Sequence, residues 1–221
     1  MYCYEFPHPA VTADIVIFTI RDRKLKILLI RRAGEPYRGA WALPGGFVEP
    51  NEGLDQAAAR ELEEETGVTG VFLEQLYTFG EPKRDPRERV ITVAYYALIP
   101  SDRLRLQAAD DAEAVGWFAM DDLPALAFDH ADIVAMAHKR LVAKLDYSTI
   151  AFAFMPERFT LTDLQEVYEI IRQEAIDKRN FRKWALSLKE IKETKEKRRV
   201  GIHRPAKLYR LKRPGTVAII K

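Results

Sequence analysis

Four glutamates crowd one short segment of the chain, where Arg60 is followed by Glu61, Glu63, Glu64 and Glu65. At about 100° per residue of an α-helix, Glu61 and Glu65 point in the direction of the helix's apolar residues, with Glu64 beside them and Glu63 opposite. Carboxylates gathered at the edge of a packing face repel one another unless a cation lies among them. Their oxygens suit a hard cation such as Mg²⁺, which keeps positions for water and phosphate oxygens. The pattern therefore favours a metal site for a phosphate ester or pyrophosphate over a solvated acidic face.

A basic segment lies far from these glutamates, near the end of the sequence. Residues 178–213 contain 15 Lys and Arg but three Asp and Glu. The net charge of +2 hides this segregation, because residues 1–150 hold 17 basic and 24 acidic residues, whereas residues 151–221 hold 18 and nine. Such asymmetry is typical of a segment that faces a polyanion.

Length and composition narrow the class of protein. The 221 residues exceed one average domain and fall short of two large ones, which favours a main domain with a small second module. A composition of 48% hydrophobic and 31% charged residues argues against a disordered, collagen-like or disulfide-stapled chain. The single cysteine, Cys3, has no partner for an internal disulfide or a zinc site. Because the sequence has no long apolar run and no signal peptide, we expect a cytoplasmic protein without membrane contact.

The glutamates need a helix to position them, and residues 54–66 form a helix-favouring run that ends at Gly67. Upstream, runs rich in Val, Ile and Leu at residues 11–20 and 24–30 are separated by a polar turn and predict a β-hairpin. Strands and helices mix without a regular βαβ repeat, which favours the α+β class. The further elements predicted are strands at 71–77, 90–99 and 114–118, a turn at 121–126 and a helix at about 129–145.

Two short helices are predicted beyond residue 159. Thr162 and Gln165 fit a capping box, and Leu164, Val167, Tyr168 and Ile171 then recur at helical spacing. Asp177 can cap a second helix, which has one apolar and one basic face. Two such helices form a helix-turn-helix, and the basic, strand-like segment after them predicts a wing. The second apolar face consists of Phe181, Trp184, Ala185 and Leu188.

The basic side chains of this region are expected to contact double-stranded DNA, with RNA or a protein as the alternative partner. In a helix-turn-helix the second helix enters the major groove, and a wing grips the phosphate backbone. The contacts predicted on the helix are Lys178, Arg179, Arg182 and Lys183. The contacts predicted on the wing are Arg198, Arg199, Arg204 and Lys207.

At the glutamates, the sequence resembles the Nudix hydrolase family. The signature of that family is matched at every fixed position from Gly46 through Glu52 and Arg60 to Val68. The resemblance covers roughly the first 145 residues and implies an α/β/α sandwich around a mixed sheet. It also implies a divalent metal held by Glu61, Glu64, Glu65 and the carbonyl of Gly45, with Arg60 and Glu52 holding the loop on the helix.

The resemblance also implies a reaction. A metal-activated water attacks one phosphorus of a nucleoside diphosphate that is linked to another group. The metal expected is Mg²⁺, with Mn²⁺ as a substitute. The catalytic residues expected are Glu61 as general base, Arg60 and Glu64; the loop residues Glu81 and Glu88 are alternatives for the base.

A loop after the signature indicates the substrate. Residues 77–89 resemble the loop of ADP-ribose-type members, which carry a Pro shortly after the signature, as Pro82 does here. This implies that ADP-ribose is split into AMP and ribose 5-phosphate, although the activity could be residual. The substrate contacts expected are Arg32, Tyr37, Trp41, Arg84 and Arg87, with plain loop packing as the alternative role for each.

A Nudix-like domain followed by a basic winged helix resembles the Nudix-related transcriptional regulators of bacteria. The resemblance implies a Nudix domain at 1–147, a linker at 148–158 and a winged helix-turn-helix domain at 159–221. It also implies a homodimer on a palindromic DNA operator, with ADP-ribose or a similar nucleotide as ligand. Many such regulators have a degenerate signature helix, whereas this one is intact. A regulator that hydrolyses its ligand and a non-catalytic, ligand-sensing repressor of NAD or sugar metabolism therefore both remain open.

Overall fold

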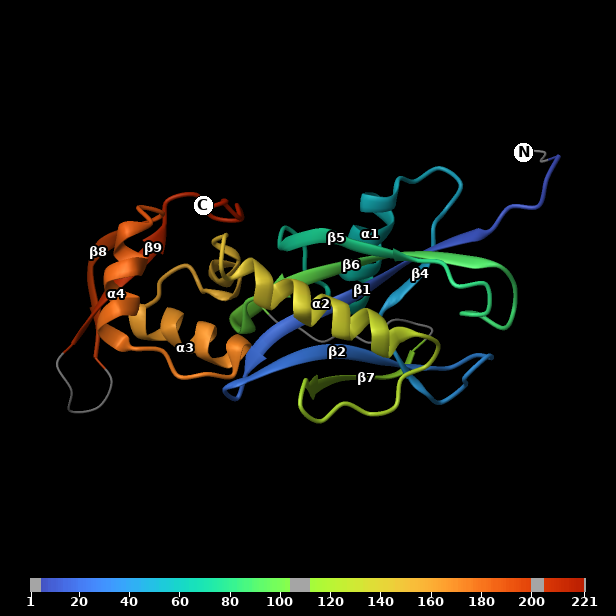
Figure 1. Ribbon diagram of the computed structural model, residues 1–221, viewed down its shortest axis with the longest axis horizontal. Helices are drawn as coiled ribbons and strands as arrows, with labels where there is room; N and C mark the ends of the chain where they lie inside the picture. Colours follow the sequence, from blue (N-terminus) through green and yellow to red (C-terminus); the bar gives the residue numbers. More distant parts are fainter. Residues whose placement is uncertain (1–4, 104–111, 200–204, 221) are drawn as a thin grey trace.

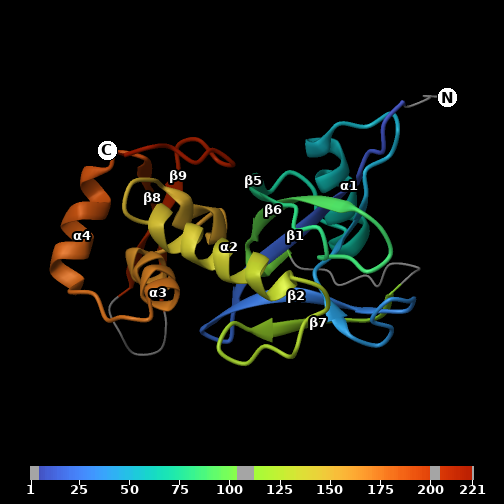
Figure 2. The same ribbon diagram turned by 45° about the vertical axis from the view of Figure 1, so that its right-hand side comes forward.

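The computed structural model describes residues 5–103, 112–199 and 205–220, so Cys3 and Arg204 lie outside the described residues. The chain forms two lobes of unequal size along its long axis (Figure 1). The larger lobe holds a sheet with helices α1 (Leu54–Thr66) and α2 (His130–Lys144). The smaller lobe holds α3 (Leu161–Arg172), α4 (Lys178–Ser187) and a β-hairpin (Figures 1 and 2). Among the described residues, no helix has the length and apolarity needed to cross a bilayer.

The described part of the larger lobe contains a mixed sheet of seven strands. β1 (Ala10–Arg21) and β2 (Lys24–Arg32) form the predicted hairpin, and β1 pairs in parallel with β6 (Val90–Ile99). The strand order is β3-β2-β1-β6-β5, with β4 paired to β1 and β7 paired to β2. The remaining strands are β3 (Trp41–Ala42), β4 (Gly45–Phe47), β5 (Phe72–Phe79) and β7 (Ala112–Ala119). The strands predicted in the β5 and β7 regions are confirmed, with shifted ends.

Side chains of the central strands alternate between two apolar cores, one on each face of the sheet. On one face, Ile15 of β1 and Tyr95 of β6 pack with Leu62 of α1. On the other face, Phe18 of β1 belongs to the core that contains Leu141 of α2. Successive strand residues point to opposite faces, so one strand can serve both cores. Helices therefore cover both faces, which confirms the α/β/α sandwich.

Helix α1 begins and ends where the sequence predicted. At its start, the amide of Gly53 donates to the side-chain oxygen of Gln56 (2.8 Å). At its end, the amide of Gly67 donates to the carbonyl of Glu63 (2.7 Å). Each end of the helix that carries the glutamates is thus fixed by a hydrogen bond to a backbone group that would otherwise lack a partner there.

The smaller lobe contains the predicted helix-turn-helix and wing. The side chain of Asp177 caps α4 by accepting from the amide of Asn180 (2.8 Å). Phe181 and Ala185 are buried on one face of α4. β8 (Ile191–Arg198) and β9 (Ala206–Leu211) pair as an antiparallel hairpin after the helices. The pattern of two helices and two strands is confirmed.

The start of α3 corrects a prediction. The sequence indicated a capping box at Thr162 and Gln165, but Thr160 is the N-cap. Its hydroxyl accepts from the amide of Asp163 (3.1 Å), and the Asp163 carboxylate accepts from the amide of Thr160 (2.8 Å). Two overlapping Thr-x-x-polar patterns compete here, and the earlier one wins because it extends the helix over Leu161, which is 1% exposed.

Residues 148–158, predicted as a linker, pack between the lobes. The 3-10 helix η2 (Ile150–Phe154) is mostly buried and shares one core with α2 and α3. The end of the chain returns to this segment, where the amide of Thr149 donates to the carbonyl of Ala218 (2.9 Å). A continuous apolar core therefore joins the two lobes, and the predicted domain limits at 147 and 159 stay predictions.

Candidate functional site

The segment 45–53, which we call the signature loop, begins as strand β4 and approaches β1 and α1 closely at two glycines. Gly45 has φ 148°, and a Cβ there would lie 2.3 Å from the carbonyl oxygen of Ala13 in β1. A Cβ on Gly46 would lie 2.4 Å from Oε1 of Glu61. Glycine permits these contacts because it has no Cβ. The loop thereby lays its backbone against the carboxylate of Glu61.

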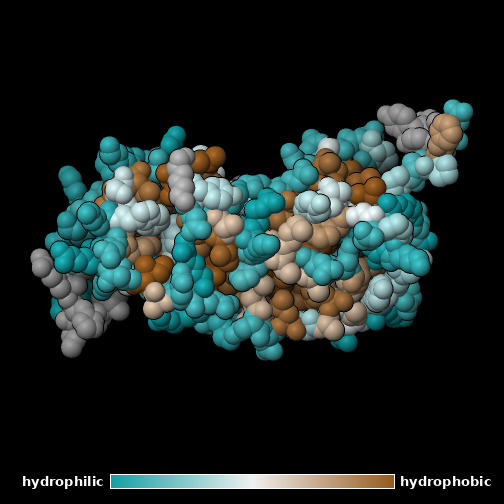
Figure 3. Space-filling view, in the orientation of Figure 1, coloured by the Kyte–Doolittle hydropathy of each residue, from teal (hydrophilic) through white to brown (hydrophobic). Residues whose placement is uncertain are grey.

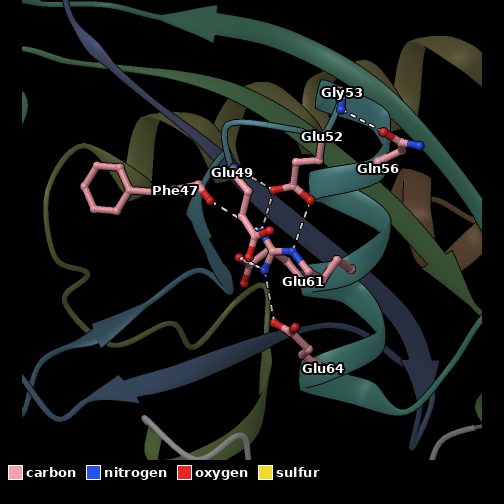
Figure 4. A network of polar contacts seen from close by, with 8 residues as sticks. Phe47, Glu49, Glu52, Gly53, Gln56, Glu61 and Glu64 are labelled. Carbon is pink, nitrogen blue, oxygen red and sulfur yellow. Dashed lines mark hydrogen bonds and ion pairs between the residues drawn. The ribbon is translucent and has the colours of Figure 1, made fainter. Parts of the chain in front are cut away.

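Arg60 ties the signature loop to α1. Its Nη2 and Nε lie 2.8 and 3.2 Å from the carboxylate oxygens of Glu52. Its Nη1 lies 2.7 Å from Oε1 of Glu61 and 3.2 Å from Oε2 of Glu64. Figure 4 shows Glu52, Glu61 and Glu64 converging from the loop and the helix. The hydrogen bonds from Arg60, and a further one from the Glu49 amide, hold the pKa of Glu52 below its usual range, so the carboxylate stays charged.

The helix orients its glutamates as the periodicity predicts. Glu61 and Glu65 are 8% and 4% exposed, whereas Glu63 and Glu64 are exposed. Leu54 was expected to point in the same direction as Glu61 and Glu65 but is exposed, because it is the first residue of the helix. Glu61 faces the loop at Gly46, while Glu64 faces solvent.

The predicted metal ligands are not arranged as a ready cluster. Within the described ranges, no three His, Cys, Asp or Glu side chains lie close enough together to hold a metal ion. Arg60 instead bridges Glu61 and Glu64. The donors still fit a hard divalent cation, because all are oxygens and the Gly46 backbone makes room for the Glu61 carboxylate.

A cavity of about 330 Å³ opens beside the signature loop. Three of the predicted substrate residues, Arg32, Arg84 and Arg87, line this cavity. Gly45 lines it as well, so the loop forms part of its wall. The lining also includes Asp14, Phe47, Asp85, Phe128 and His130. The structure thus brings together residues that lie far apart in the sequence.

Tyr37 and Trp41 lie outside the described lining of this cavity. The ring of Tyr37 packs edge to face on Phe128, with centroids 4.8 Å apart. Trp41 packs in the same manner on Phe118 (4.7 Å), and its carbonyl accepts from the amide of Ala127 (2.8 Å). These contacts pack the two rings against neighbouring side chains, and a substrate contact at either residue stays a prediction.

Arg84 is buried in the cavity wall between two acids that the sequence reasoning missed. Its Nε and Nη2 lie 2.9 and 2.6 Å from the carboxylate oxygens of Asp129, and Nη2 lies 3.5 Å from Oδ2 of Asp14. Only 3% of the Arg84 side chain is exposed. Asp14 is the one charge in the apolar run 11–20, a signal that could have identified it. Asp129 carries no such local signal.

His130 completes this buried group at the start of α2. The amide of Leu43 donates to Nδ1 of His130 (2.9 Å), and Nε2 lies 3.8 Å from Oδ2 of Asp14. Burial lowers the pKa of His130, although the charge of Asp14 acts in the opposite direction. The neutral ring therefore carries its proton on Nε2, facing Asp14.

Two aromatic rings frame Arg87 in the cavity. Its guanidinium carbon lies 5.4 Å from the ring centroid of Phe47 and 5.8 Å from that of Phe128. Asp85 holds it through Nε–Oδ1 and Nη2–Oδ2 contacts of 3.0 and 2.7 Å. Burial alone would raise the pKa of Asp85, but the hydrogen bonds from Arg87 outweigh it and lower that pKa. Arg32 adds a second cation 4.9 Å from the Phe128 centroid, so the wall offers both charge and flat apolar surface.

The two loop glutamates considered as alternative general bases adjoin residues of the cavity wall, since the carbonyl of Glu81 accepts from the amide of Arg84 (3.1 Å) and Glu88 follows Arg87. Glu81 and Glu88 are exposed, and both lie outside the described cavity lining. Glu61 lies against Gly46, which does line the cavity. The general base therefore stays a prediction, with Glu61 on the helix and Glu81 and Glu88 in the loop as alternatives.

Helix α4 presents its basic residues to solvent. All four predicted contacts, Lys178, Arg179, Arg182 and Lys183, are exposed. The opposite face of α4 is buried in the core that it shares with α3. This amphipathic arrangement leaves the charged face available to a partner.

The predicted wing contacts differ in their surroundings. Nη2 of Arg198 lies 2.5 and 2.6 Å from the carboxylate oxygens of Asp163, at the start of α3. Nζ of Lys207 lies 2.9 Å from the Glu193 carboxylate. Arg199 is exposed, and Arg204 lies outside the described residues.

A basic cavity lies between the start of α3, helix α4 and the wing. Its volume is about 300 Å³, and Arg182, Lys197 and Lys207 are among its lining residues. Figure 3 shows hydrophilic side chains over the outer end of the smaller lobe, with hydrophobic residues farther in on this lobe and on the larger lobe. A polar, basic surface of this kind matches the phosphate backbone of a nucleic acid.

Comparison with known proteins covers both lobes. The NUDIX domain family matches residues 9–137, and the NrtR DNA-binding winged helix domain family matches residues 151–211. An ADPR responsive transcriptional repressor NtrR of Acinetobacter baylyi is 39% identical over 93% of this chain and 83% of its own length. An ADP-ribose pyrophosphatase of Methanocaldococcus jannaschii is 41% identical over 58% of this chain and 72% of its own. Shewanella oneidensis NrtR, in a crystal structure with a 27mer DNA, is 37% identical with a TM-score of 0.83, covering 91% of this chain and 93% of that one.

These matches agree with the geometry on two separate points. The first family covers the sandwich with its signature loop, and the second covers the helix-turn-helix with its wing. The Acinetobacter and Shewanella relatives extend across both lobes together. The chain therefore belongs to the Nudix family and, within it, to the NrtR type, in which a Nudix domain is joined to a DNA-binding winged helix.

Proposed function

We propose that this protein is an ADP-ribose-responsive regulator of transcription whose Nudix domain also hydrolyses ADP-ribose. One observation carries the proposal. The same chain contains a cavity lined by three arginines and two aromatic rings and an exposed basic helix, and a continuous apolar core joins the two lobes that carry them. The names of the Acinetobacter and Methanocaldococcus relatives support ADP-ribose as the ligand. The non-catalytic repressor remains the second candidate.

The cavity matches the chemistry of ADP-ribose. Guanidinium groups pair with phosphate oxygens, and Arg32 and Arg87 are the two arginines of the wall that lie against aromatic rings. Phe47 and Phe128 offer flat apolar surface on which a purine base can stack. Arg84 is buried between Asp129 and Asp14 with 3% of its side chain exposed, whereas 38% of the Arg87 side chain is exposed, so we assign Arg84 the role of holding the wall in place. The diphosphate is therefore placed near Arg32 and Arg87, with the base on the phenylalanines.

Nudix hydrolases generally use a divalent metal, and we propose that it is Mg²⁺ here, with Mn²⁺ as a substitute. The residues that would hold it are Glu61, Glu64, Glu65 and the carbonyl of Gly45. A divalent metal at this place neutralises phosphate charge and lowers the pKa of a bound water. Arg60 now holds Glu61 and Glu64, and these contacts compete with metal ligation.

The smaller lobe is assigned to operator DNA. We place α4 in the major groove, with Lys178, Arg179, Arg182 and Lys183 toward phosphates and base edges. The wing residues Arg198, Arg199, Arg204 and Lys207 would lie along the backbone. A homodimer would present two such helices to a palindrome, and the protein would work in the cytoplasm, where the DNA is.

The enzymatic half is tested by incubation with ADP-ribose and Mg²⁺. Release of AMP and ribose 5-phosphate is expected. Glu64→Gln or Glu65→Gln should lower the rate by about 100-fold, because a bound metal lowers the activation barrier by several kcal/mol. Glu63→Gln is the matched control, since Glu63 is exposed on the same helix. No products, or equal rates in all three variants, would exclude hydrolysis at this site.

The regulatory half is tested by gel shift with the DNA upstream of the protein's own gene. ADP-ribose should release the DNA from the wild type. If it also releases the DNA from Glu64→Gln, then sensing does not require turnover. Release of DNA together with no detectable hydrolysis in the wild type would establish the second candidate, a purely sensing repressor.

A further inference from the structure

A separate cavity, of about 530 Å³, lies where the two lobes meet. Leu145 and Asp146, at the end of α2, form one side of it. Tyr168 and Arg172 of α3 and the start of α4 form the others. This place belongs neither to the Nudix cavity nor to the basic face of α4, and the roles assigned above make no use of it.

Three aromatic rings build one wall of this cavity. The ring centroid of Tyr168 lies 5.3 Å from that of Phe181 and 5.2 Å from that of Trp184, both at steep angles. The Phe181 and Trp184 centroids lie 5.3 Å apart. Trp184 is half-buried, so part of its surface remains available. Such a wall offers flat, electron-rich faces to a ligand.

The hydroxyl of Tyr168 is an unsatisfied polar group in this wall. Tyr168 is 3% exposed, and no hydrogen-bond partner reaches its hydroxyl among the residues that the structure describes. Burial raises the pKa of Tyr168, so the phenol is neutral and can both donate and accept. Buried polar groups without partners are uncommon in folded proteins and call for an explanation such as a ligand or a bound water.

The charges around the cavity are mainly acidic. Asp146, Glu174 and Asp177 contribute three carboxylates, whereas Arg172 contributes one guanidinium. The Nη atoms of Arg172 are paired with Asp146 and, at 3.3 Å, with Glu174, whereas its Nε has no hydrogen-bond partner among the described residues. The surplus of carboxylates favours a positively charged occupant over an anion.

We propose that this cavity is a second ligand site, which binds a planar aromatic cation that carries N–H donors. The ring of the ligand lies against Trp184 and Phe181, its charged group faces the carboxylates of Glu174 and Asp177, and one N–H donates to the Tyr168 hydroxyl. The occupant contacts α3 and α4 beside Leu145 and Asp146, which follow α2, so it lies between the Nudix lobe and the DNA-binding helix.

The test uses benzamidinium as the probe and the full-length protein, observed by two-dimensional ¹H–¹⁵N NMR. The chain has three tryptophans, and the Trp184→Phe variant identifies the Trp184 indole resonance. We expect that resonance to shift and saturate with benzamidinium, while those of Trp41 and Trp117 stay in place. Benzoate, with the same ring and the opposite charge, and guanidinium, with the charge but no ring, should each leave it unmoved.

Three conservative variants locate the contacts. Glu174→Gln should weaken benzamidinium binding about 3-fold, the size expected for one exposed charge pair. Tyr168→Phe keeps the ring and removes the hydroxyl, and should weaken binding about 5-fold. Glu157→Gln is the control, because Glu157 is exposed and lies outside the described lining of the cavity; binding should not change.

Three results would overturn the proposal: a Trp184 resonance that does not move, an equal shift with benzoate, or affinities unchanged in both Glu174→Gln and Tyr168→Phe. The titration is repeated in saturating ADP-ribose, where the same shift is expected because the two sites are separate. A failure of ADP-ribose to bind would bear on the Nudix cavity alone and would leave this titration interpretable.

Discussion

The position of the Glu61 carboxylate depends on Gly46, which allows it to approach the loop closely. The Gly46→Ala variant should keep the fold but displace Glu61, because the new Cβ would lie 2.4 Å from Oε1. We expect hydrolysis of ADP-ribose to fall by about 100-fold, the loss typical of a catalytic group misplaced by about 1 Å. The rate and the melting temperature are measured together, with Gly80→Ala as control, since a Cβ there meets only Ile91 at 3.7 Å. Equal rates in both variants would contradict the placement of Glu61.

A second residue-scale prediction concerns His130, which faces Asp14, Arg84, Asp129 and Arg32. Its pKa is lowered in the folded protein below the ordinary value of 6.5. The unfolded chain therefore binds the proton more readily, so the contribution of His130 to stability is present above pH 6.5 and is lost as the pH falls below it.

The variant His130→Asn isolates this effect, because its side-chain oxygen can accept from the Leu43 amide and its side chain does not titrate. Urea unfolding between pH 7.5 and 5 should show a smaller loss of stability with falling pH in the variant than in the wild type. Parallel curves for the two proteins would show that His130 is not the titrating group.

Individual site residues were predictable only where the signal was local. Helical periodicity identified the buried Glu61 and Glu65, since it depends on neighbours a few residues away. The burial of Arg84 was not predictable, because its partner Asp129 is 45 positions away and is brought near only by the sheet. A single sequence does not distinguish an exposed loop arginine from a buried structural one.

At the element scale, the cap of α3 provides a direct test of the corrected helix start. Thr160→Ala removes the acceptor for the Asp163 amide and should cost about 1 kcal/mol in the free energy of unfolding. Thr162→Ala, two residues later on an exposed position, should cost much less. Urea unfolding of both variants measures the difference, and a larger loss at Thr162 would restore the cap that the sequence first indicated.

Element types were more predictable than element ends. The apolar runs of β1, β2 and β6 and the glutamate helix α1 carry strong periodic signals, and each formed where expected. The 3-10 helix η2 was expected to be part of a linker, because five residues are too few to show a helical period. Its burial depends on α2 and α3, which no local pattern reveals.

At the scale of the whole molecule, one core passes from the sheet through η2 to α4. Phe152 is 2% exposed within it, so Phe152→Ala should cost about 3–5 kcal/mol. Because both lobes use this core, we expect them to unfold in one transition that shifts as a unit. Calorimetry tests this together with the fluorescence of a variant that carries Trp41→Phe and Trp117→Phe, in which Trp184 is the remaining tryptophan and reports the smaller lobe. A Trp184 signal that melts separately would mean that the lobes are independent.

We expect occupation of the Nudix cavity to change the affinity of α4 for DNA. The most direct measurement is fluorescence anisotropy of a labelled duplex from the protein's own upstream region, titrated with protein at fixed salt in the presence and absence of ADP-ribose. The account predicts that ADP-ribose weakens the affinity for DNA by about 5- to 150-fold, the usual range of coupling between two sites. It also predicts that Phe128→Ala loses most of this response while binding DNA normally without ligand. Identical DNA affinities with and without saturating ADP-ribose in the wild type would contradict it.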